Sequence, residues 1–100
     1  MTAFPNDRER DVRKHLKTRL KALGGELRKV SWFQRRGAPD ELVLVPARGF
    51  MRARYFFAEL KAPGKWLEPH QEREIKKLHD HGVPVMVLDS REAVDAALFW

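Results

Sequence analysis

Two oppositely charged side chains stand two positions apart in the segment Glu59-Leu60-Lys61, at the end of an apolar stretch. On an extended strand, residues two apart project from the same face, so Glu59 and Lys61 would lie side by side while Leu60 points into the opposite layer. Charges at the end of a buried strand are costly unless they pair or bind something. The two groups could therefore pair with each other, or they could belong to a chemical site.

A second carboxylate, Asp40, follows Pro39 at the start of another apolar stretch. If residues 42–45 and 54–60 form an antiparallel hairpin, the start of one strand lies beside the end of the other, which places Asp40 and Glu59 at the same end of the sheet. Neighbouring carboxylates repel each other unless a cation lies between them, and such oxygen ligands suit Mg²⁺ or Mn²⁺. Asp40 could instead be an ordinary turn residue after a proline.

Two further polar side chains begin the apolar stripes of predicted helices. Glu9 extends by one turn the stripe at positions 12, 16, 20 and 23, where it could be a metal ligand or a capping partner of Asn6. Gln71 begins the inward face that continues through positions 75, 78 and 82. Its amide could hydrogen-bond a site residue or a phosphate, or it could be an ordinary first-turn residue.

Helices and strands that would position these residues follow the order α-β-β-β-α-β-α. Apolar periodicity and capping residues predict helices at Asp7–Leu23, Pro69–Gly82 and from Asp89 to the C-terminus. Asn6 would cap the first helix, and Asp89 with Glu92 would form a capping box for the last. The apolar end of that helix, residues 96–100, would pack on the sheet or meet a second subunit.

Four segments rich in β-forming residues are predicted as strands, at Leu27–Phe33, Leu42–Val45, Arg54–Leu60 and Val83–Leu88. Residues 47–51 are expected to form a hairpin loop between the second and third strands. The third strand has apolar residues on both faces, which is typical of a central strand covered on both sides. Pro84 places the fourth strand at an edge, or itself near the beginning of that strand.

Length and composition limit the classes of protein to which this chain can belong. The 100 residues suit one domain over residues 1–100, and 43% hydrophobic with 34% charged residues indicates a globular protein. The absence of cysteine excludes a disulfide scaffold, a thiol nucleophile and a thiolate metal site. No apolar run approaches ~20 residues and the N-terminus lacks a signal-peptide core, so we expect a soluble intracellular, cytoplasmic protein of viral or cellular origin.

The net charge of +6 favours a polyanionic partner, with nucleic acid first, although a solvated basic surface without a partner is the alternative. Candidate phosphate contacts, which would carry little sequence information, are Arg13, Lys17, Arg35, Arg36 and Lys65. Trp66 could stack on an exposed base, but an anchoring contact with the core is the expected role. The four histidines form no convincing zinc site.

Taken in order along the chain, these features resemble the virus-type replication-repair nuclease (VRR-NUC) domain of the PD-(D/E)xK nuclease superfamily. The matching pieces are Gly37-Ala38-Pro39-Asp40, Phe57-Ala58-Glu59-Leu60-Lys61, Pro69-His70-Gln71 and Gly82–Leu88. The resemblance runs from Glu9 to the last helix. Glu68 departs from it, because the family often has a serine cap there.

This resemblance implies a restriction-endonuclease-like core, with a central mixed sheet flanked by helices. It implies a homodimeric DNA endonuclease that uses Mg²⁺ or Mn²⁺ and acts on branched DNA such as Holliday junctions in replication or repair. Metal would be bound by Glu9, Asp40, Glu59 and the backbone carbonyl of Leu60, with Lys61 as the catalytic lysine and Gln71 in support. A catalytically silent nucleic-acid-binding module of the same fold and a small scaffold protein are the alternatives.

Overall fold

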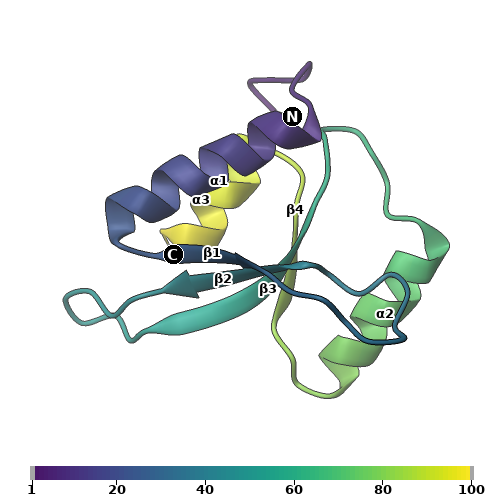
Figure 1. The fold of residues 1–100 in the computed structure, drawn as a ribbon. Helices are drawn as coiled ribbons and strands as arrows, with labels where there is room; N and C mark the ends of the chain where they lie inside the picture. The colour runs from purple at the N-terminus through teal and green to yellow at the C-terminus, as the bar shows by residue number, and fades with distance from the viewer. Residues whose placement is uncertain (1, 100) are drawn as a thin grey trace.

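Four strands form one mixed sheet in the computed structural model, which describes residues 2–99 (Figure 1). They lie side by side in chain order as β1 (Glu26–Lys29), β2 (Glu41–Val45), β3 (Arg54–Leu60) and β4 (Val85–Leu88). The helices are α1 (Glu9–Leu23), α2 (Pro69–Asp80) and α3 (Arg91–Leu98). The first three strands are antiparallel, and β4 runs parallel to β3 after a crossover through α2. The predicted order of elements and the α/β class with a mixed sheet are confirmed.

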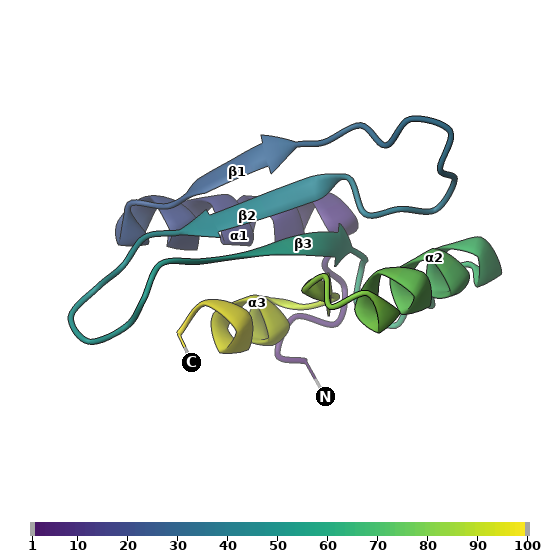
Figure 2. The same cartoon turned by 90° about the horizontal axis from the view of Figure 1, so that it is seen from below.

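One face of the sheet is covered by α1 and α3, which pack together, whereas α2 lies beside β4 beyond the end of β3 (Figures 1 and 2). Alternate residues of β2 and β3 point into the core under α1 and α3, namely Val43, Val45, Phe56, Ala58 and Leu60. On the opposite face Tyr55 is 53% exposed. The expectation that β3 is covered on both sides is therefore wrong along part of its length, because the residues that the structure describes leave Tyr55 on this face about half exposed.

Helix α1 follows its apolar stripe, since Val12, Leu16 and Leu20 are all buried. The helix begins two residues later than predicted, and its N-cap is Arg8 rather than Asn6. The reason is local, because the Asp11 carboxylate accepts a hydrogen bond of 2.8 Å from the Arg8 backbone N–H. Glu9 is thus the first helical residue and not the third, so it cannot be the capping partner of Asn6.

Strand β1 ends at Lys29, four residues earlier than the sequence predicts. The Val30 N–H still donates to the Asp40 carbonyl at 2.9 Å, but residues 31–33 leave the strand, and the Trp32 ring packs on Phe57 with 5.2 Å between ring centroids. The Trp32 indole N–H also donates to the carbonyl oxygen of Pro39 at 2.7 Å, which closes the segment 30–40 into a loop.

The other boundaries differ from expectation by smaller amounts. β2 begins one residue early at Glu41, and β3 has the predicted bounds. The hairpin loop predicted at 47–51 is present, with Arg48 and Met51 bonded to each other in both directions. α2 ends at Asp80, before Gly82. β4 begins late, at Val85, but it lies at the sheet edge as Pro84 predicted.

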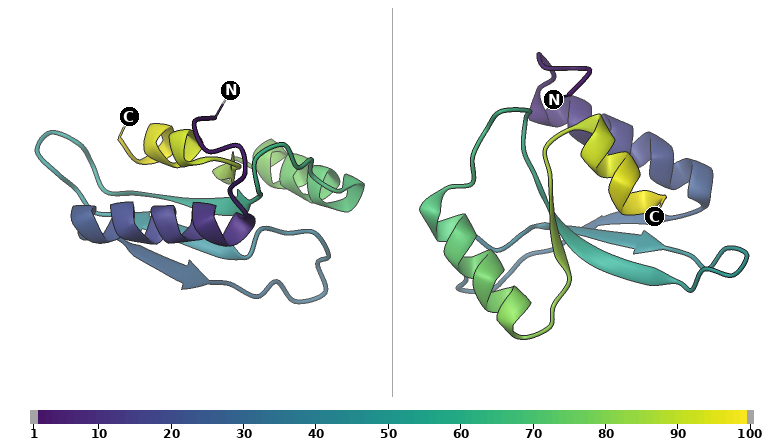
Figure 3. Two further views of the ribbon diagram at one scale, coloured as in Figure 1. Left: turned by 90° about the horizontal axis from the view of Figure 1, so that it is seen from above. Right: turned by 180° about the vertical axis from the view of Figure 1, so that it is seen from behind.

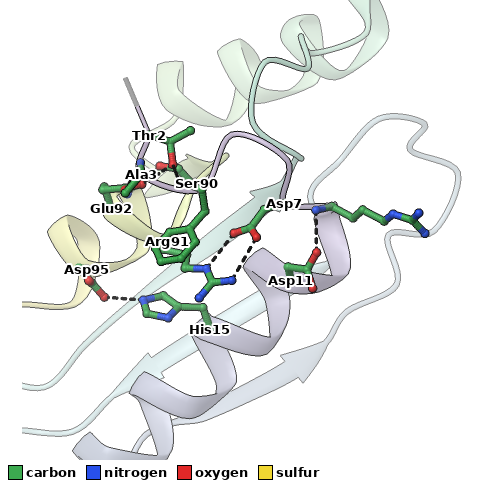
Figure 4. A network of polar contacts seen from close by, with 12 residues as sticks. Thr2, Ala3, Asp7, Asp11, His15, Ser90, Arg91, Glu92 and Asp95 are labelled. Carbon is green, nitrogen blue, oxygen red and sulfur yellow. Dashed lines mark hydrogen bonds and ion pairs between the residues drawn. The ribbon is translucent and has the colours of Figure 1, made fainter.

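A network of polar contacts ties the N-terminal segment and α1 to α3 (Figure 4). Arg91 donates two hydrogen bonds to Asp7 at 2.8 and 3.1 Å. The Glu92 carboxylate accepts from the Thr2 hydroxyl and the Ala3 backbone N–H, both at 2.8 Å, and these bonds lower the pKa of Glu92 to about 2. Because this carboxylate is engaged there, the cap of α3 is Ser90 and not the predicted Asp89 with Glu92.

Helix α3 ends at Leu98, which is buried with Ala97, while Phe99 is about half exposed. The apolar end of the chain is therefore packed on the sheet at least through Leu98. The predicted continuation of the helix is wrong at Phe99, which is its C-cap, and Trp100 lies outside the described residues. None of the helices within residues 2–99 is both long enough and apolar enough to cross a membrane.

Candidate active site

The hairpin of β2 and β3 brings Asp40 and Glu59 to the same end of the sheet. Glu41 pairs with Ala58 in the antiparallel register, and one further step places Asp40 opposite Glu59. Glu59 is half-buried and Asp40 is exposed. Leu60 is buried in the core, on the face opposite to Glu59, as the two-residue alternation predicts. The juxtaposition that the sequence predicted is therefore confirmed.

A side chain from α2 completes this end of the sheet. Gln71 donates from Nε2 to Oε1 of Glu59 at 2.7 Å, and its own Oε1 accepts from the Glu68 backbone N–H at 2.9 Å. The second bond makes Gln71 the capping partner of the helix start and fixes which way its amide points. The amide thus contacts Glu59 while it anchors the first turn of α2.

The charge environment of Glu59 is unusual for a carboxylate. Burial raises the pKa of Glu59 to about 7, and the negative charge of Asp40 adds to this effect. The ammonium of Lys61 lowers this pKa in part, whereas Glu9 and then Glu41 raise it. The end of the sheet therefore gathers four carboxylates within electrostatic reach of one another, an arrangement that a bound cation would relieve.

One of these carboxylates, Glu41, was not identified as a site residue from the sequence. Its side chain is only 2% exposed, and it contacts Nη2 of Arg13 and Nζ of Lys29, both at 3.1 Å. The missed signal is the alternation along β2, since Glu41 precedes Val43 and Val45 on the inward face. Because the predicted strand begins at Leu42, Glu41 was not among the residues assigned to its inward face.

Basic side chains lie against the predicted acidic ligands. Arg13 bridges Glu9 at 3.5 Å and Glu41, and Lys29 bridges Asp40 at 3.2 Å and Glu41. Within residues 2–99, no three His, Asp or Glu side chains converge closely enough to hold a metal ion in this arrangement. The fold thus brings the backbones of the predicted ligands to one end of the sheet, and ion pairs turn the Glu9 and Asp40 carboxylates toward arginine and lysine.

The predicted phosphate contacts separate into two groups. Arg13 is engaged with the acidic cluster, and Arg35 makes a two-point bond to the buried Glu74 at 3.0 and 2.9 Å, which lowers the pKa of that carboxyl. Arg35 therefore also fastens the loop 30–40 to α2. The other three, Lys17, Arg36 and Lys65, are exposed. Trp66 is also exposed, which corrects the expectation that it anchors in the core.

An α/β core with acidic residues and a lysine at the start of β2 and just after the end of β3 is the arrangement that the resemblance to PD-(D/E)xK nucleases implies. Residues 7–92 match the family model of the VRR-NUC domain, and the chain belongs to this family. A solved structure described as "VRR_NUC domain" is similar, with 39% identity, a TM-score of 0.73, and coverage of 88% of this chain and 90% of that one.

A phage protein is similar at the level of sequence. It is named "Putative nuclease p44", from Acyrthosiphon pisum secondary endosymbiont phage 1, and it is 39% identical over 85 residues. The match spans 85% of this chain and 86% of the phage protein. Together with the family, this relative supports a nuclease role, which is a hydrolase activity on nucleic acid.

Proposed function

We propose that the chain is a Mg²⁺- or Mn²⁺-dependent DNA endonuclease, with its chemistry at the end of the sheet where β2 begins and β3 ends. The observation that carries this proposal is the register that sets Asp40 opposite Glu59, with Lys61 directly after the end of β3. Burial and neighbouring negative charge raise the pKa of Glu59 to about 7. A bound cation would favour the ionised form of this carboxylate, so the raised pKa supports a metal site here. One nuclease domain would cover residues 1–100.

The donor set fits a hard divalent cation. We assign Glu9, Asp40, Glu59 and the backbone carbonyl of Leu60 as its ligands, all of which supply the oxygen atoms that Mg²⁺ and Mn²⁺ prefer. Asp40 and Glu9 are exposed, so each carboxylate can turn from Lys29 or Arg13 toward the ion at little cost. When bound, the metal would polarise the phosphate and lower the pKa of a water molecule.

The remaining residues would act around that centre. The Lys61 ammonium, on the same face as Glu59, would orient the attacking water or stabilise the negative charge that develops on the phosphate. Gln71 is a positioning residue, because its hydrogen bond holds Oε1 of Glu59 while Glu68 holds the amide. The exposed cations Arg36, Lys65 and Lys17 would contact phosphates of the DNA, with Arg35 and Arg13 supporting them from their ion pairs.

The resemblance of the sequence to VRR-NUC domains also suggests a class of DNA substrate. Branched DNA, such as a Holliday junction formed in replication or repair, would be cut by a homodimer whose two active sites act on two strands. The net charge of +6 supports a polyanionic substrate, although charge alone does not select among DNA structures.

The second candidate is a catalytically silent nucleic-acid-binding module. One observation favours it, because Lys29 and Arg13 already neutralise Asp40 and Glu9 and thus could replace a metal ion. Such a module would bind DNA through its basic side chains without cutting it. A scaffold protein would do neither.

Cleavage of labelled DNA separates these functions. Single-stranded, duplex, flap and four-way-junction substrates would be incubated with wild type, with Lys61→Ala and with Lys76→Ala, each with Mg²⁺, with Mn²⁺ and with EDTA. Lys76 is a matched control, since it is an exposed lysine of α2 whose ion pair is with Asp80 of the same helix. We expect wild type and Lys76→Ala to cut only with metal, and Lys61→Ala to bind DNA without cutting. Binding without cleavage by wild type across all metals and substrates would favour the silent module.

A further inference from the structure

Two large aromatic side chains project into solvent from the loops that meet the acidic end of the sheet. Phe33 and Trp66 are each 87% exposed. Phe33 lies in the loop that leads into Asp40, and Trp66 lies in the loop that leaves Lys61. Figure 3 (left) shows these two loops at the same end of the sheet, next to α2. A single exposed ring is ordinary on a protein surface, but two rings that border one site indicate a contact surface.

The exposure of Phe33 does not come from a loose loop. On one side the Trp32 ring is fixed against Phe57 and Pro39, and on the other Arg35 is fixed to Glu74. Between them, the Arg35 N–H donates to the Trp32 carbonyl at 3.3 Å and closes a turn that has Phe33 at its tip.

The backbone of that turn is also strained. Gln34 has φ of +56°, a left-handed conformation that is unfavourable for a residue other than glycine. The Phe33 ring is therefore held in solvent by a strained turn, and the residues on both sides of that turn are anchored.

Trp66 is presented in a similar way. The Lys65 N–H donates to the Ala62 carbonyl at 3.1 Å, across a turn in which Gly64 has φ of +79°. Two residues after Trp66, Glu68 is held by Gln71 at the start of α2. The Trp66 ring thus lies between a closed turn and the anchored start of α2, and it remains exposed.

Both rings have cations next to them in the chain. Arg36 follows the Phe33 turn and Lys65 precedes Trp66, and both side chains are exposed. Aromatic rings interleaved with cations suit a strand of nucleic acid whose bases are unpaired, because the rings stack on base faces and the cations contact phosphates. Paired bases in a duplex are stacked on each other, so they present no free face to a ring.

We propose that Phe33 and Trp66 are stacking surfaces for unpaired bases, so that the DNA bound at this end of the sheet has unpaired nucleotides on both sides of the Asp40 and Glu59 pair. The role of this surface in presenting DNA for cleavage rests on the proposed nuclease function, but the stacking itself can be measured without cleavage. The occupant is single-stranded DNA, and a protein partner or a second copy of the chain would use the same rings without this preference.

Binding is measured in the full-length Lys61→Ala background with EDTA, so that cleavage does not interfere. A labelled thymidine oligonucleotide and a fully paired duplex are the probes, at one fixed ionic strength. Phe33→Ala with Trp66→Ala is expected to weaken oligonucleotide binding by about tenfold or more, with less than about a twofold effect on the duplex. Phe50→Ala is the matched control, since Phe50 is a fully exposed ring at the tip of the β2–β3 hairpin, the other end of the same strands.

Trp66→Phe preserves an aromatic face, and we expect it to restore most of the oligonucleotide affinity that Trp66→Ala loses. Equal weakening of oligonucleotide and duplex binding, or no weakening of either, would overturn the proposal. So would a change of sedimentation from dimer to monomer in the double variant, because the rings would then form a subunit interface. If wild type binds the oligonucleotide through these rings yet cuts no DNA with any metal, stacking stands and the proposed nuclease function fails.

Discussion

Gln71 on α2 donates a 2.7 Å hydrogen bond to Glu59 on β3, and the same amide accepts from the Glu68 backbone N–H. One side chain therefore couples the start of a helix to the half-buried carboxylate at the end of the central sheet. The position of that carboxylate depends on α2, an element that otherwise packs beside β4.

Replacement of Gln71 by alanine would release Glu59 from this hold. We expect cleavage efficiency and Mn²⁺ affinity to fall by about 10- to 100-fold, the range found when partners that orient metal ligands are removed. Titration calorimetry and initial cleavage rates measure the two effects. Glu72→Ala, an exposed position in the same helical turn, is the control. Unchanged Mn²⁺ affinity in Gln71→Ala would show that the hydrogen bond does not position Glu59.

The raised pKa of Glu59 predicts how the metal-free protein responds to pH. The pKa is about 7 in the folded chain and 4.5 as the reference, so between these values the folded chain retains a proton that the unfolded chain has lost. The contribution of Glu59 to stability therefore falls as pH rises from about 4.5 to about 7. Glu59→Gln removes this slope, so in EDTA it should melt at a higher temperature than wild type at pH 8 and at a similar temperature near pH 4.5.

The control for this pH dependence is Glu72→Gln, which changes an exposed carboxylate of α2. It should melt in parallel with wild type at every pH. Addition of Mn²⁺ at pH 8 should raise the melting temperature of wild type and not that of Glu59→Gln. A melting difference between Glu59→Gln and wild type that is equal at pH 4.5 and pH 8 would argue against the raised pKa.

Glu41 is expected to be important for stability. Glu41→Ala leaves Arg13 and Lys29 without the buried carboxylate that both contact, and we expect a loss of about 2 kcal/mol in the free energy of unfolding. The loss should be smaller than for a fully buried pair, because Lys29 is largely exposed. Urea denaturation measures it. Glu26→Ala, which removes an exposed pair with Arg28, should change stability by less than about 0.5 kcal/mol.

Gly37 is required where the loop 30–40 touches α2. Its φ is +85°, and a Cβ atom there would lie 2.6 Å from the backbone oxygen of His70, which precedes Gln71. Gly37→Ala should therefore destabilise the fold and also displace the first turn of α2, with lower cleavage activity. Gly49→Ala has the same unfavourable sign of φ but no atom within 4 Å, so it isolates the backbone term of about 1–2 kcal/mol. Equal unfolding free energies for the two variants would show that the contact with His70 has no energetic consequence.

The sequence predicted the parts of this fold that depend on local pattern. The bounds of β3 follow from its apolar run, and the juxtaposition of Asp40 with Glu59 follows from the antiparallel hairpin. Gln71 was found because it begins the inward face of its helix, which is where it meets Glu59. These inferences hold because alternation and helical periodicity fix which side of an element a residue occupies.

What the sequence did not predict depends on tertiary partners. Trp32 and Phe33 have high β-propensity, yet they lie outside the sheet, where the Trp32 ring packs on Phe57. Trp66 was expected to make an anchoring contact with the core, and no local pattern distinguishes a buried indole from an exposed one. Asp7 was assigned to α1, but the helix begins after it, and its carboxylate instead binds Arg91, 84 positions away in sequence.

Metal binding by the acidic end of the sheet is the claim on which the proposed function depends. Titration calorimetry of Mn²⁺ into wild type and Glu59→Gln at pH 8, where Glu59 is ionised, tests it without DNA. We expect wild type to bind Mn²⁺ and Glu59→Gln to bind it at least about tenfold more weakly. Equal Mn²⁺ affinity in the two proteins, or no binding by wild type, would contradict the account.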